Sequence, residues 1–474
     1  MAPDRSACDV LVVGGGPAAG TAARLLSQWG RDVVVVAKPG GAEPELPESL
    51  TPSCQKFFDL MGMSPAIEGA GFVRSSGHTV WWGDGDARCE PFSDGARGWQ
   101  ATTSRLSRVM LDSAAAAGAR IQRALLTADE VLAWPAAYRL DCTGRSGLLA
   151  RAHGGRAYEP GHRTVALVGL WRHPGGPHAH WPLANPTHTL LESYQDGWAW
   201  SVPVDDVRRA LAVMVDPTTT ALAKGDGARS VYVWEIAKTR HLAELFHGAD
   251  LIHGPHGWDA SMYLSERPAG DTWLLVGDAA SFVDPLSSAG VKKAMASGWL
   301  AAVTLNTALA TPALKDTAFA HYAARERDTY RQFLTLTRKH LADGAPEVDH
   351  PFWADRAASA DDDADRQGVL AAYDRIRHAS SLALSLGPGV RLADRPALRE
   401  RLLVLEPRLV DAANPEGVRF VDGVDVVVLT RLAPRFSDLA DLFDAYLGEG
   451  DVVALPAFLK ALATAVARGW LLGV

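Results

Sequence analysis

Three small residues near the N-terminus have the spacing that lets an anion approach the protein backbone. Gly14, Gly16 and Ala19 form the pattern Gly-x-Gly-x-x-Ala within "DVLVVGGGPAAG". The first glycine allows a tight turn, the second lets a pyrophosphate come close to the main chain, and the small third residue lets a helix pack against a strand. The free N–H groups at the start of that helix then face the anion. The pattern predicts a dinucleotide-binding turn.

The elements around the turn are those of a dinucleotide-binding fold. A buried apolar strand precedes the turn, residues 18–29 have the pattern of a helix, and residues 32–36 predict a second buried strand. This fold places an acid that binds the ribose hydroxyls after the second strand. The sequence instead has Lys38 there, so either a later acid such as Glu43 or Glu45 replaces it or the adenosine is held more loosely.

The composition indicates a globular protein of two or three domains. The chain has 474 residues, of which 47% are hydrophobic and 22% charged, a net charge of -8 and no dense run of Lys or Arg. Nucleic acid is therefore not an expected partner. Four scattered cysteines without a CxxC pair argue against a metal site and favour a reducing cytosol. The start of the chain leaves no room for a signal peptide, and no apolar run reaches about 18 residues, so we expect a cytoplasmic protein without a membrane span.

Three segments far apart in the sequence predict parts of one nucleotide-binding domain. They are residues 1–40, the strand end and turn "YRLDCTGRSG", and the strand, Gly-Asp turn, loop and helix at 272–302. Four short β-rich runs between residues 164 and 215 predict an antiparallel sheet inserted into this α/β domain. The expected division is a discontinuous nucleotide-binding domain (1–160 and 265–335), a β-sheet substrate domain (161–264), a helical linker or cap (336–420) and a small C-terminal module (421–474).

Together these segments resemble the FAD-dependent monooxygenase superfamily, in the branch of flavin-dependent halogenases, geranylgeranyl reductases and the flavoproteins that oxidise tryptophan during maturation of quinone-cofactor amine oxidases. The resemblance covers about residues 8–335, and its longest motif is "GDAASFVDPLSSAGV". It implies an α/β fold with a Rossmann-like FAD-binding domain, an inserted antiparallel β-sheet substrate domain and a mainly helical C-terminal module. Gly277 and Asp278 would meet the flavin ribityl chain, and Asp284 and Pro285 would begin the loop under the isoalloxazine ring.

The same motif implies a helix whose N-terminus points toward the pyrimidine edge of the flavin. The helix would start near Ser288, with Gly290 and Val291 in its first turn. Negative charge develops at this edge when the flavin is reduced, and the N-terminus of a helix stabilises negative charge. We therefore count Gly290 and Val291 among the cofactor-binding candidates and Ser288 among the catalytic ones.

Three shorter segments match the same branch in the same order along the chain. "LPESLTPS" resembles a segment that would place Glu48 and Ser49 near the flavin. "GWQATTSRL" resembles one that would put Arg105 beside the cofactor, and "DCTGRSG" resembles one in which Asp141 and Gly144 approach the adenosine side.

The strand that carries the relay lysine of halogenases has no lysine in this chain. In this branch, reduced flavin and O2 give a C4a-hydroperoxide, and the protein decides where its distal oxygen goes. "GFVRSSGHTVWWG" resembles the strand from which a lysine relays hypohalous acid, but Ser75 or Ser76 stands at that position. Arg74 cannot replace the lysine because a guanidinium stays protonated. The missing lysine argues against halogenation.

Aromatic residues and one histidine complete the catalytic candidates. "WAWSVP" at 198–203 resembles the W-x-W-x-I-P signature of halogenases, although non-halogenating relatives also have aromatic residues there. Tryptophans at such positions form either the wall of an aromatic cavity or the core of the sheet. His78 lies on the segment that faces the flavin in relatives, and it is suited either to acid–base exchange or to a structural hydrogen bond in a strand. The catalytic candidates are His78, Trp198, Trp200 and Ser288.

The expected function is therefore an FAD-dependent monooxygenase that hydroxylates or oxidises an indole or phenol-like ring. The alternatives are a halogenase with another relay, an FAD-dependent reductase of prenyl double bonds, and a flavin-binding accessory protein without turnover. No second glycine fingerprint is visible for NAD(P)H, so electrons come either from transiently bound NAD(P)H or from a separate flavin reductase.

The C-terminal tail bears on the kind of substrate. Residues 421–474 faintly resemble small winged-helix modules that hold peptides in peptide-modifying systems. This resemblance implies an aromatic side chain on a peptide or protein as substrate, in place of a small aromatic molecule. The alternative is a cap on the flavin domain or a dimer contact.

Overall fold

The computed structural model describes residues 3–40, 47–83, 86–153, 155–175, 180–224, 227–346, 350–356, 363–379 and 381–473. Glu43 and Glu45, the acids considered for the ribose, lie outside these residues. The chain divides into two compact units, Met1–Ser359 and Ala360–Val474, and each is described by itself.

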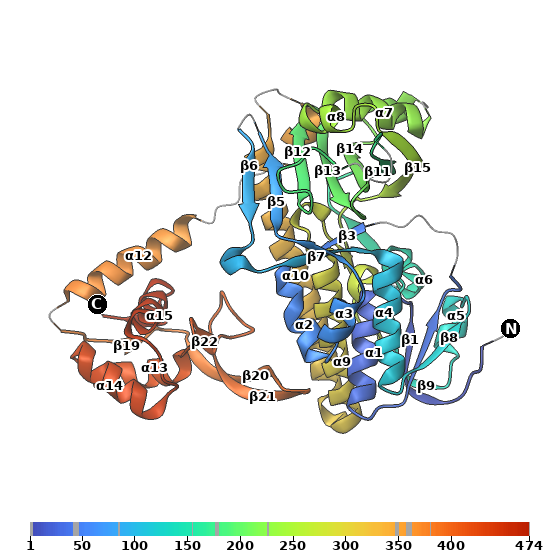
Figure 1. The fold of residues 1–474 in the computed structure, drawn as a ribbon. Coiled ribbons are helices and arrows are strands. Elements are labelled where there is room, and N and C mark those ends of the chain that lie inside the picture. The colour runs from blue at the N-terminus through green and yellow to red at the C-terminus, as the bar shows by residue number, and fades with distance from the viewer. Residues whose placement is uncertain are drawn as a thin grey trace. The chain divides into compact units, whose positions relative to one another are not determined.

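The first unit is built on a five-stranded parallel sheet (Figure 1). Its strands in spatial order are β17 (Trp273–Leu275), β9 (Ala136–Asp141), β1 (Cys8–Val13), β2 (Val33–Ala37) and β8 (Arg120–Arg123). The three segments predicted to form one nucleotide-binding domain thus supply neighbouring strands of one sheet. Every residue of β2 is buried, as expected of a strand covered on both faces.

Helices cover both faces of the parallel sheet. Leu11 and Val13 pack with residues of α5 (Ala128–Leu132) and α6 (Leu148–His153). Helix α1 (Pro17–Gln28) packs against α4 (Thr103–Ala116) and α9 (Gly290–Ala310). The crossing of α1 and α9 requires a glycine, because a Cβ on Gly298 would lie 2.6 Å from the carbonyl oxygen of Ala18.

A seven-stranded sheet forms the second layer of this unit, near the top of Figure 1. The four predicted β-rich runs form four neighbouring strands in it, and a further strand follows at 250–259. Two strands from residues 77–91 complete the sheet, because residues 78–81 pair in parallel with residues 189–192, so this part of the 1–160 segment belongs to the second layer. The spatial order is β15 (Asp250–Asp259), β11 (Val165–Arg172), β14 (Arg208–Val215), β13 (Gly197–Pro203), β12 (Thr189–Tyr194), β5 (Gly77–Trp81) and β6 (Arg88–Pro91).

Helices also cover both faces of the seven-stranded sheet. One face packs against α7 (Ala228–Lys238) and α8 (His241–Leu245). The other buries a tryptophan-rich cluster together with Leu341 near the end of α10 (Lys315–Gly344) and Trp353 of α11 (Pro351–Ala354).

Two three-stranded sheets also belong to this unit. One contains β3 (Pro47–Leu50), β7 (Gly98–Thr102) and β4 (Val73–Ser75), next to α2 (Gln55–Leu60) and α3 (Ser64–Gly69). The other contains β10 (Arg156–Tyr158), β16 (Tyr263–Ser265) and β18 (Ser281–Phe282). Figure 1 shows β3 and β7 in the region between the two large sheets.

The second unit has its own hydrophobic core and is not wholly helical. The segment expected as a helical linker contains a long hairpin, in which residues 391–399 pair antiparallel with residues 402–410. Pro396 and Pro407 would each interrupt a helix at this place. Its elements are α12 (Asp363–His378), β19 (Ser385–Leu386), β20 (Arg391–Arg399), β21 (Leu402–Val410), β22 (Phe420–Val421), β23 (Val424–Asp425), α13 (Val426–Leu432), α14 (Leu439–Glu449), α15 (Leu455–Ala467) and β24 (Leu471–Leu472).

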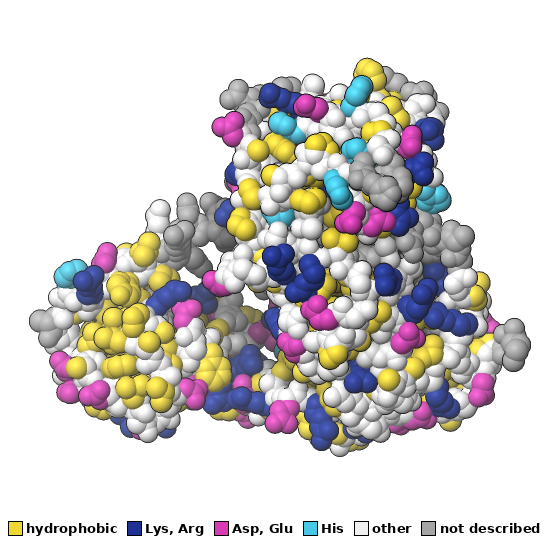
Figure 2. All heavy atoms as spheres, in the orientation of Figure 1, with side chains coloured by type: hydrophobic (Ala, Val, Ile, Leu, Met, Phe, Trp, Pro, Cys, Tyr) yellow, Lys and Arg dark blue, Asp and Glu magenta, His cyan; other side chains and the backbone are white. Residues whose placement is uncertain are grey.

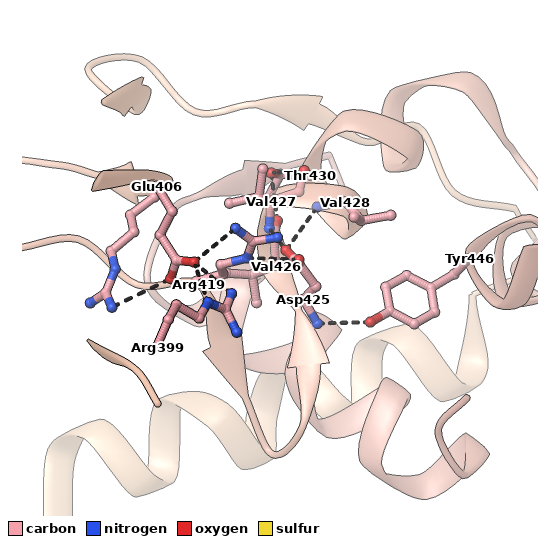
Figure 3. Close-up of polar contacts among 10 residues, drawn as sticks. Arg399, Glu406, Arg419, Asp425, Val426, Val427, Val428, Thr430 and Tyr446 are labelled. Atoms are coloured by element: carbon pink, nitrogen blue, oxygen red, sulfur yellow. Dashed lines mark hydrogen bonds and ion pairs between the residues drawn. The ribbon is translucent and has the colours of Figure 1, made fainter. Parts of the chain in front are cut away.

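A polar network joins the hairpin to the helices of the second unit (Figure 3). The carboxylate of Glu406 accepts hydrogen bonds from Arg399 at 2.6 Å and Arg419 at 3.3 Å. Arg419 also donates to Asp425 at 3.0 Å, and Asp425 accepts from the first N–H groups of α13. The backbone N–H of Asp425 donates to the Tyr446 hydroxyl.

Figure 2 shows hydrophobic side chains gathered on one face of this unit, and its exposed apolar residues include Val452, which is 92% exposed.

Candidate active site

The glycine turn has the geometry that the sequence pattern requires. Gly14 has a φ of +127°, and a Cβ on it would lie 2.1 Å from the carbonyl oxygen of Cys142. Gly16 precedes the first turn of α1, and a Cβ on it would meet nothing within 4 Å. Ala19 is fully buried inside α1. Gly14 therefore lets β1 and β9 approach each other, while Gly16 leaves open space at the N-terminus of α1.

Asp141 holds the neighbouring loop at the end of β9. Its carboxylate accepts hydrogen bonds from the Thr143 N–H and hydroxyl and from the Leu149 N–H at the start of α6. Burial raises the pKa of Asp141, and these hydrogen bonds oppose that shift. Gly144 follows with a φ of +63° and open space beside it. The carboxylate of Asp141 thus orders the loop, and Gly144 provides the open surface.

A buried lysine organises the Gly-Asp turn. Lys293 on α9 is 3% exposed, and its ammonium lies 3.3 Å from the carbonyl oxygen of Gly277 and 3.5 Å from the Asp278 carboxylate. It also donates to the carbonyl of Ser281. Lys293 was not predicted as a site residue, although a lysine among the small and apolar residues of α9 has few exposed positions to occupy.

Two carboxylates, Asp278 and Glu326, interact with this lysine, and Glu48 lies near Asp278. Burial and the nearby Asp278 raise the pKa of Glu48 to about 7. Burial also raises the pKa of Glu326 on α10, and Lys293 lowers it in part. Asp278 and Glu326 therefore share one ammonium, whereas Glu48, next to Asp278, stays protonated up to near neutral pH.

We expect the contribution of Glu48 to the stability of the FAD-free protein to fall as pH rises from 4.5 to about 7. A carboxyl with a raised pKa in the folded state binds more protons there than in the unfolded state, so its favourable contribution is complete below pH 4.5 and is lost as pH rises through about 7. The loss attributable to Glu48 is roughly 2–3 kcal/mol. In urea unfolding across this range, the wild type should lose stability relative to Glu48→Gln as pH rises; a constant difference between the two proteins would contradict the assignment.

The loop after β18 and the start of α9 match the sequence motif. Asp284 caps this loop by accepting a hydrogen bond from the Leu286 N–H, and burial raises the pKa of Asp284 to about 6. Pro285 opens a single 3₁₀ turn that ends at Ser288, which has a left-handed φ of +48°. Helix α9 then begins at Gly290, where a Cβ would meet nothing within 4 Å, and Val291 is buried.

These open positions fit an extended dinucleotide. Gly16, Gly144 and Gly290 each leave free space where a side chain would stand, and each lies at the carboxyl end of a strand or the N-terminus of a helix. Such positions are where α/β folds bind dinucleotides. In FAD, the pyrophosphate would approach Gly16 and the ribityl chain would approach Asp278. The residues present thus fit the cofactor.

The strand with the missing lysine presents hydroxyl groups and histidines. Ser75 is 1% exposed and donates to the carbonyl of Gly77, whereas Ser76 Oγ lies 3.0 Å from Nε2 of His188. Nδ1 of His188 lies 3.0 Å from the Thr79 hydroxyl. His78 packs its ring edge-on against Phe92.

His78 and His188 differ in how well their nitrogens are satisfied. Nδ1 of His78 is buried and has no hydrogen-bond partner among the described residues, while both nitrogens of His188 are bonded. Burial lowers the pKa of both histidines, so both rings are neutral near pH 7. His188, which the sequence analysis did not single out, therefore anchors the strand, and His78 is the histidine left to accept a new proton donor.

Ser49 is linked to this strand through a second set of hydrogen bonds. The Thr189 hydroxyl donates to Ser49 Oγ at 3.1 Å and accepts from the Gln100 amide at 3.0 Å. Oε1 of Gln100 is buried without a partner among the described residues. These contacts join β3, β7 and β12 beside the end of β5.

The remaining candidates lie apart from the Gly-Asp turn. Trp198 is 1% exposed and packs edge-on against Trp82 inside the tryptophan-rich cluster, which also touches Leu286 of the loop. Trp200 packs against the same cluster, and its indole N–H is buried without a partner among the described residues. Arg105 is exposed and lies over Phe72 at 5.8 Å from the ring centroid.

Neither a metal cluster nor a spanning helix emerges from the residues that the structure describes. No group of three or more His, Cys, Asp or Glu side chains there is arranged to hold a metal ion. Among the same residues, no helix has both the length and the apolar character needed to cross a bilayer.

The parallel sheet, the glycine turn and the Gly-Asp loop define an FAD-dependent oxidoreductase of the Rossmann type. The family model for the FAD-binding domain matches residues 7–129, and that for tryptophan halogenases matches residues 134–380, which is more than half of the chain. The chain belongs to the tryptophan halogenase family. This confirms the resemblance, the fold class and the FAD cofactor predicted from the sequence.

Individual relatives include both halogenating and hydroxylating proteins. A tryptophan 2-halogenase of Chondromyces crocatus is 27% identical over 64% of this chain and 62% of its own length, so the match spans less than two thirds of that relative. The halogenase CmlS covers 99% of this chain and 96% of its own with a TM-score of 0.79 at 19% identity. The peptidyl tryptophan dihydroxylase QhpG covers 96% and 98%, with a TM-score of 0.68 at 22% identity. At these identities the two structures show the fold alone.

Proposed function

We propose that this protein is an FAD- and O2-dependent monooxygenase that hydroxylates or oxidises an indole or phenol-like ring. The observation that supports this most directly is the strand at 73–83, which has no lysine to carry a halogen. Ser75 is turned to the backbone, and Ser76 is bonded to His188. Neither hydroxyl has the nucleophilic nitrogen that a halogen relay needs.

In this proposal His78 is the acid–base group. Its neutral ring has one buried nitrogen without a partner, so it can accept the proton of a ring hydroxyl or indole N–H as the ring becomes electron-rich. Ser76, His188 and Thr79 hold the strand that carries it. Trp198 and Trp200 form an apolar wall that excludes water, and Ser288 ends the turn before α9. Reduced FAD, when bound, supplies the electrons that reduce O2 and allow one oxygen atom to reach the substrate.

The remaining candidates serve the cofactor in the same proposal. The turn with Gly14, Gly16 and Ala19 receives the pyrophosphate, and Gly144 lies beside the adenosine. Glu48, Ser49 and Arg105 lie toward the flavin, as do the loop and helix start at Asp284, Pro285, Gly290 and Val291. The electrons come from NAD(P)H or from a partner flavin reductase. The second unit serves as a cap or as a docking module for a peptide-borne substrate.

The test is the mass of the product. The FAD-loaded protein is supplied with NADH, a flavin reductase, isotopically labelled O2 and an indole, a phenol or a tryptophan-containing peptide, with and without bromide. We expect one labelled oxygen atom in the product under both conditions.

His78→Gln should lower turnover roughly a hundredfold while flavin binding is retained. The wild-type rate should fall with acid only below pH 6.5, because burial lowers the pKa of His78.

Halogenation is the second candidate, because the chain belongs to a halogenase family and contains the W-x-W segment. A product that carries bromine in place of hydrogen only when bromide is present would favour it and contradict the monooxygenase proposal. Turnover without O2 would instead favour a reductase. If no aromatic substrate speeds flavin reoxidation, a non-catalytic flavin-binding protein is favoured.

A further inference from the structure

A cavity of about 420 Å³ opens beside the loop that leads into α9. One wall is formed by residues 51–53, which follow β3, and another by Ser287 and Lys292 at the start of α9. Phe92 and, from α10, Phe333 and Leu336 form apolar walls. The volume lies in the range of pockets that hold small organic ligands.

Lys292 is the only ionisable side chain among the described residues that line the cavity. It is half-buried, and the structure gives it no ion pair with a described residue, whereas its neighbour Lys293 is bound to Asp278. Thr51, Ser53 and Ser287 line the same cavity; the hydroxyls of Thr51 and Ser53 are bonded to each other, and that of Ser287 donates to the carbonyl of Asp284. An ammonium without an ion pair, partly shielded from water, favours an anionic group.

The apolar walls of the cavity indicate the apolar part of the ligand. Phe92, Phe333 and Leu336 offer ring faces and methyl groups rather than hydrogen bonds. Phe92 also packs edge-on against His78, with ring centroids 5.2 Å apart. The occupant therefore combines an aromatic body with one negative charge.

We propose that this cavity binds the substrate and that Lys292 selects an aromatic carboxylate by pairing with its carboxyl group. The proposal rests on the proposed oxidation of an aromatic ring and names its substrate class. Lys292 is a specificity-determining residue here. The charge–charge contact favours the carboxylate over a neutral amide of the same shape.

The test measures binding without turnover. Indole-3-acetate and indole-3-acetamide are titrated into the FAD-loaded, oxidised protein by calorimetry, with inorganic phosphate as a competitor. We expect the acetate to bind at least tenfold more tightly than the amide. Lys292→Gln should remove this preference by weakening acetate binding alone, and Lys292→Arg should retain most of it. Lys56→Gln is the matched control, because Lys56 also lies near Cys54 but does not line the cavity.

Several outcomes would overturn the proposal. These are equal binding of acetate and amide by the wild type, an unchanged preference in Lys292→Gln, and loss of FAD rather than of acetate in that variant. Phosphate that displaces the acetate at equal concentration would assign the cavity to phosphate esters and would also overturn it. Acetate binding through Lys292 without any oxygenated product would contradict the proposed function and leave this inference standing.

Discussion

Replacing Gly14 by alanine is expected to abolish FAD binding and to destabilise the protein itself. The new Cβ would lie 2.1 Å from the carbonyl oxygen of Cys142, in a backbone with a φ of +127° that alanine rarely adopts. Either β1 or the loop after β9 would have to move. The free energy of unfolding of the FAD-free protein should fall by roughly 3 kcal/mol or more.

Gly16→Ala is the matched control because it separates folding from cofactor binding. Its Cβ would meet nothing within 4 Å, and Gly16 has a φ of -86°, which alanine adopts readily. The unfolding free energy should change by less than roughly 1 kcal/mol. FAD affinity should still fall roughly tenfold or more, because the methyl group would occupy the space that the pyrophosphate needs. Urea unfolding and the FAD-to-protein ratio measure the two effects. Full FAD content in Gly16→Ala would show that the pyrophosphate lies elsewhere.

The parts of the fold that could be predicted are those specified by residues close together in the sequence. The buried run before Gly14, the β-rich runs between residues 164 and 215 and the motif at 277–291 each specify their own element through periodicity and turn residues. The pairing of β5 with β12 could not be predicted in this way. It joins residues more than one hundred positions apart, and parallel strands leave no turn signal between them.

The residues of the candidate site also divide into those that a sequence pattern predicts and those that only the structure brings together. Gly14 and Gly16 were predicted from the spacing of small residues after a buried strand, whereas Gly277 was predicted from the resemblance of its motif to the family. His188 was not predicted, because a single histidine in a loop forms no sequence pattern. Its role comes from its contacts with Ser76 and Thr79, which lie far away in the sequence. Asp141 was expected to approach the adenosine side, which stays a prediction, and the structure adds that its carboxylate orders the loop.

Replacing Lys293 by methionine is expected to have the second large effect. Methionine fills a similar volume but leaves the carbonyl groups of Gly277 and Ser281 without their donor and Asp278 without its counter-charge. Removing one partner from a buried charged group costs roughly 3–5 kcal/mol. The FAD-free protein should therefore unfold at lower urea concentration, and the disordered Gly-Asp turn should hold FAD poorly.

Two further variants show whether this loss arises from buried charge. Lys292→Met removes the same charge one residue earlier, where the side chain is half-buried and has no described ion pair, so its unfolding free energy should change by less than roughly 0.5 kcal/mol. Lys293→Met combined with Glu326→Gln should be more stable than Lys293→Met alone, because the second change removes a carboxylate that the lysine no longer neutralises. If the double variant is no more stable, the role of Lys293 is limited to its bonds with the two carbonyl groups, and the carboxylates around it do not act as one charged cluster.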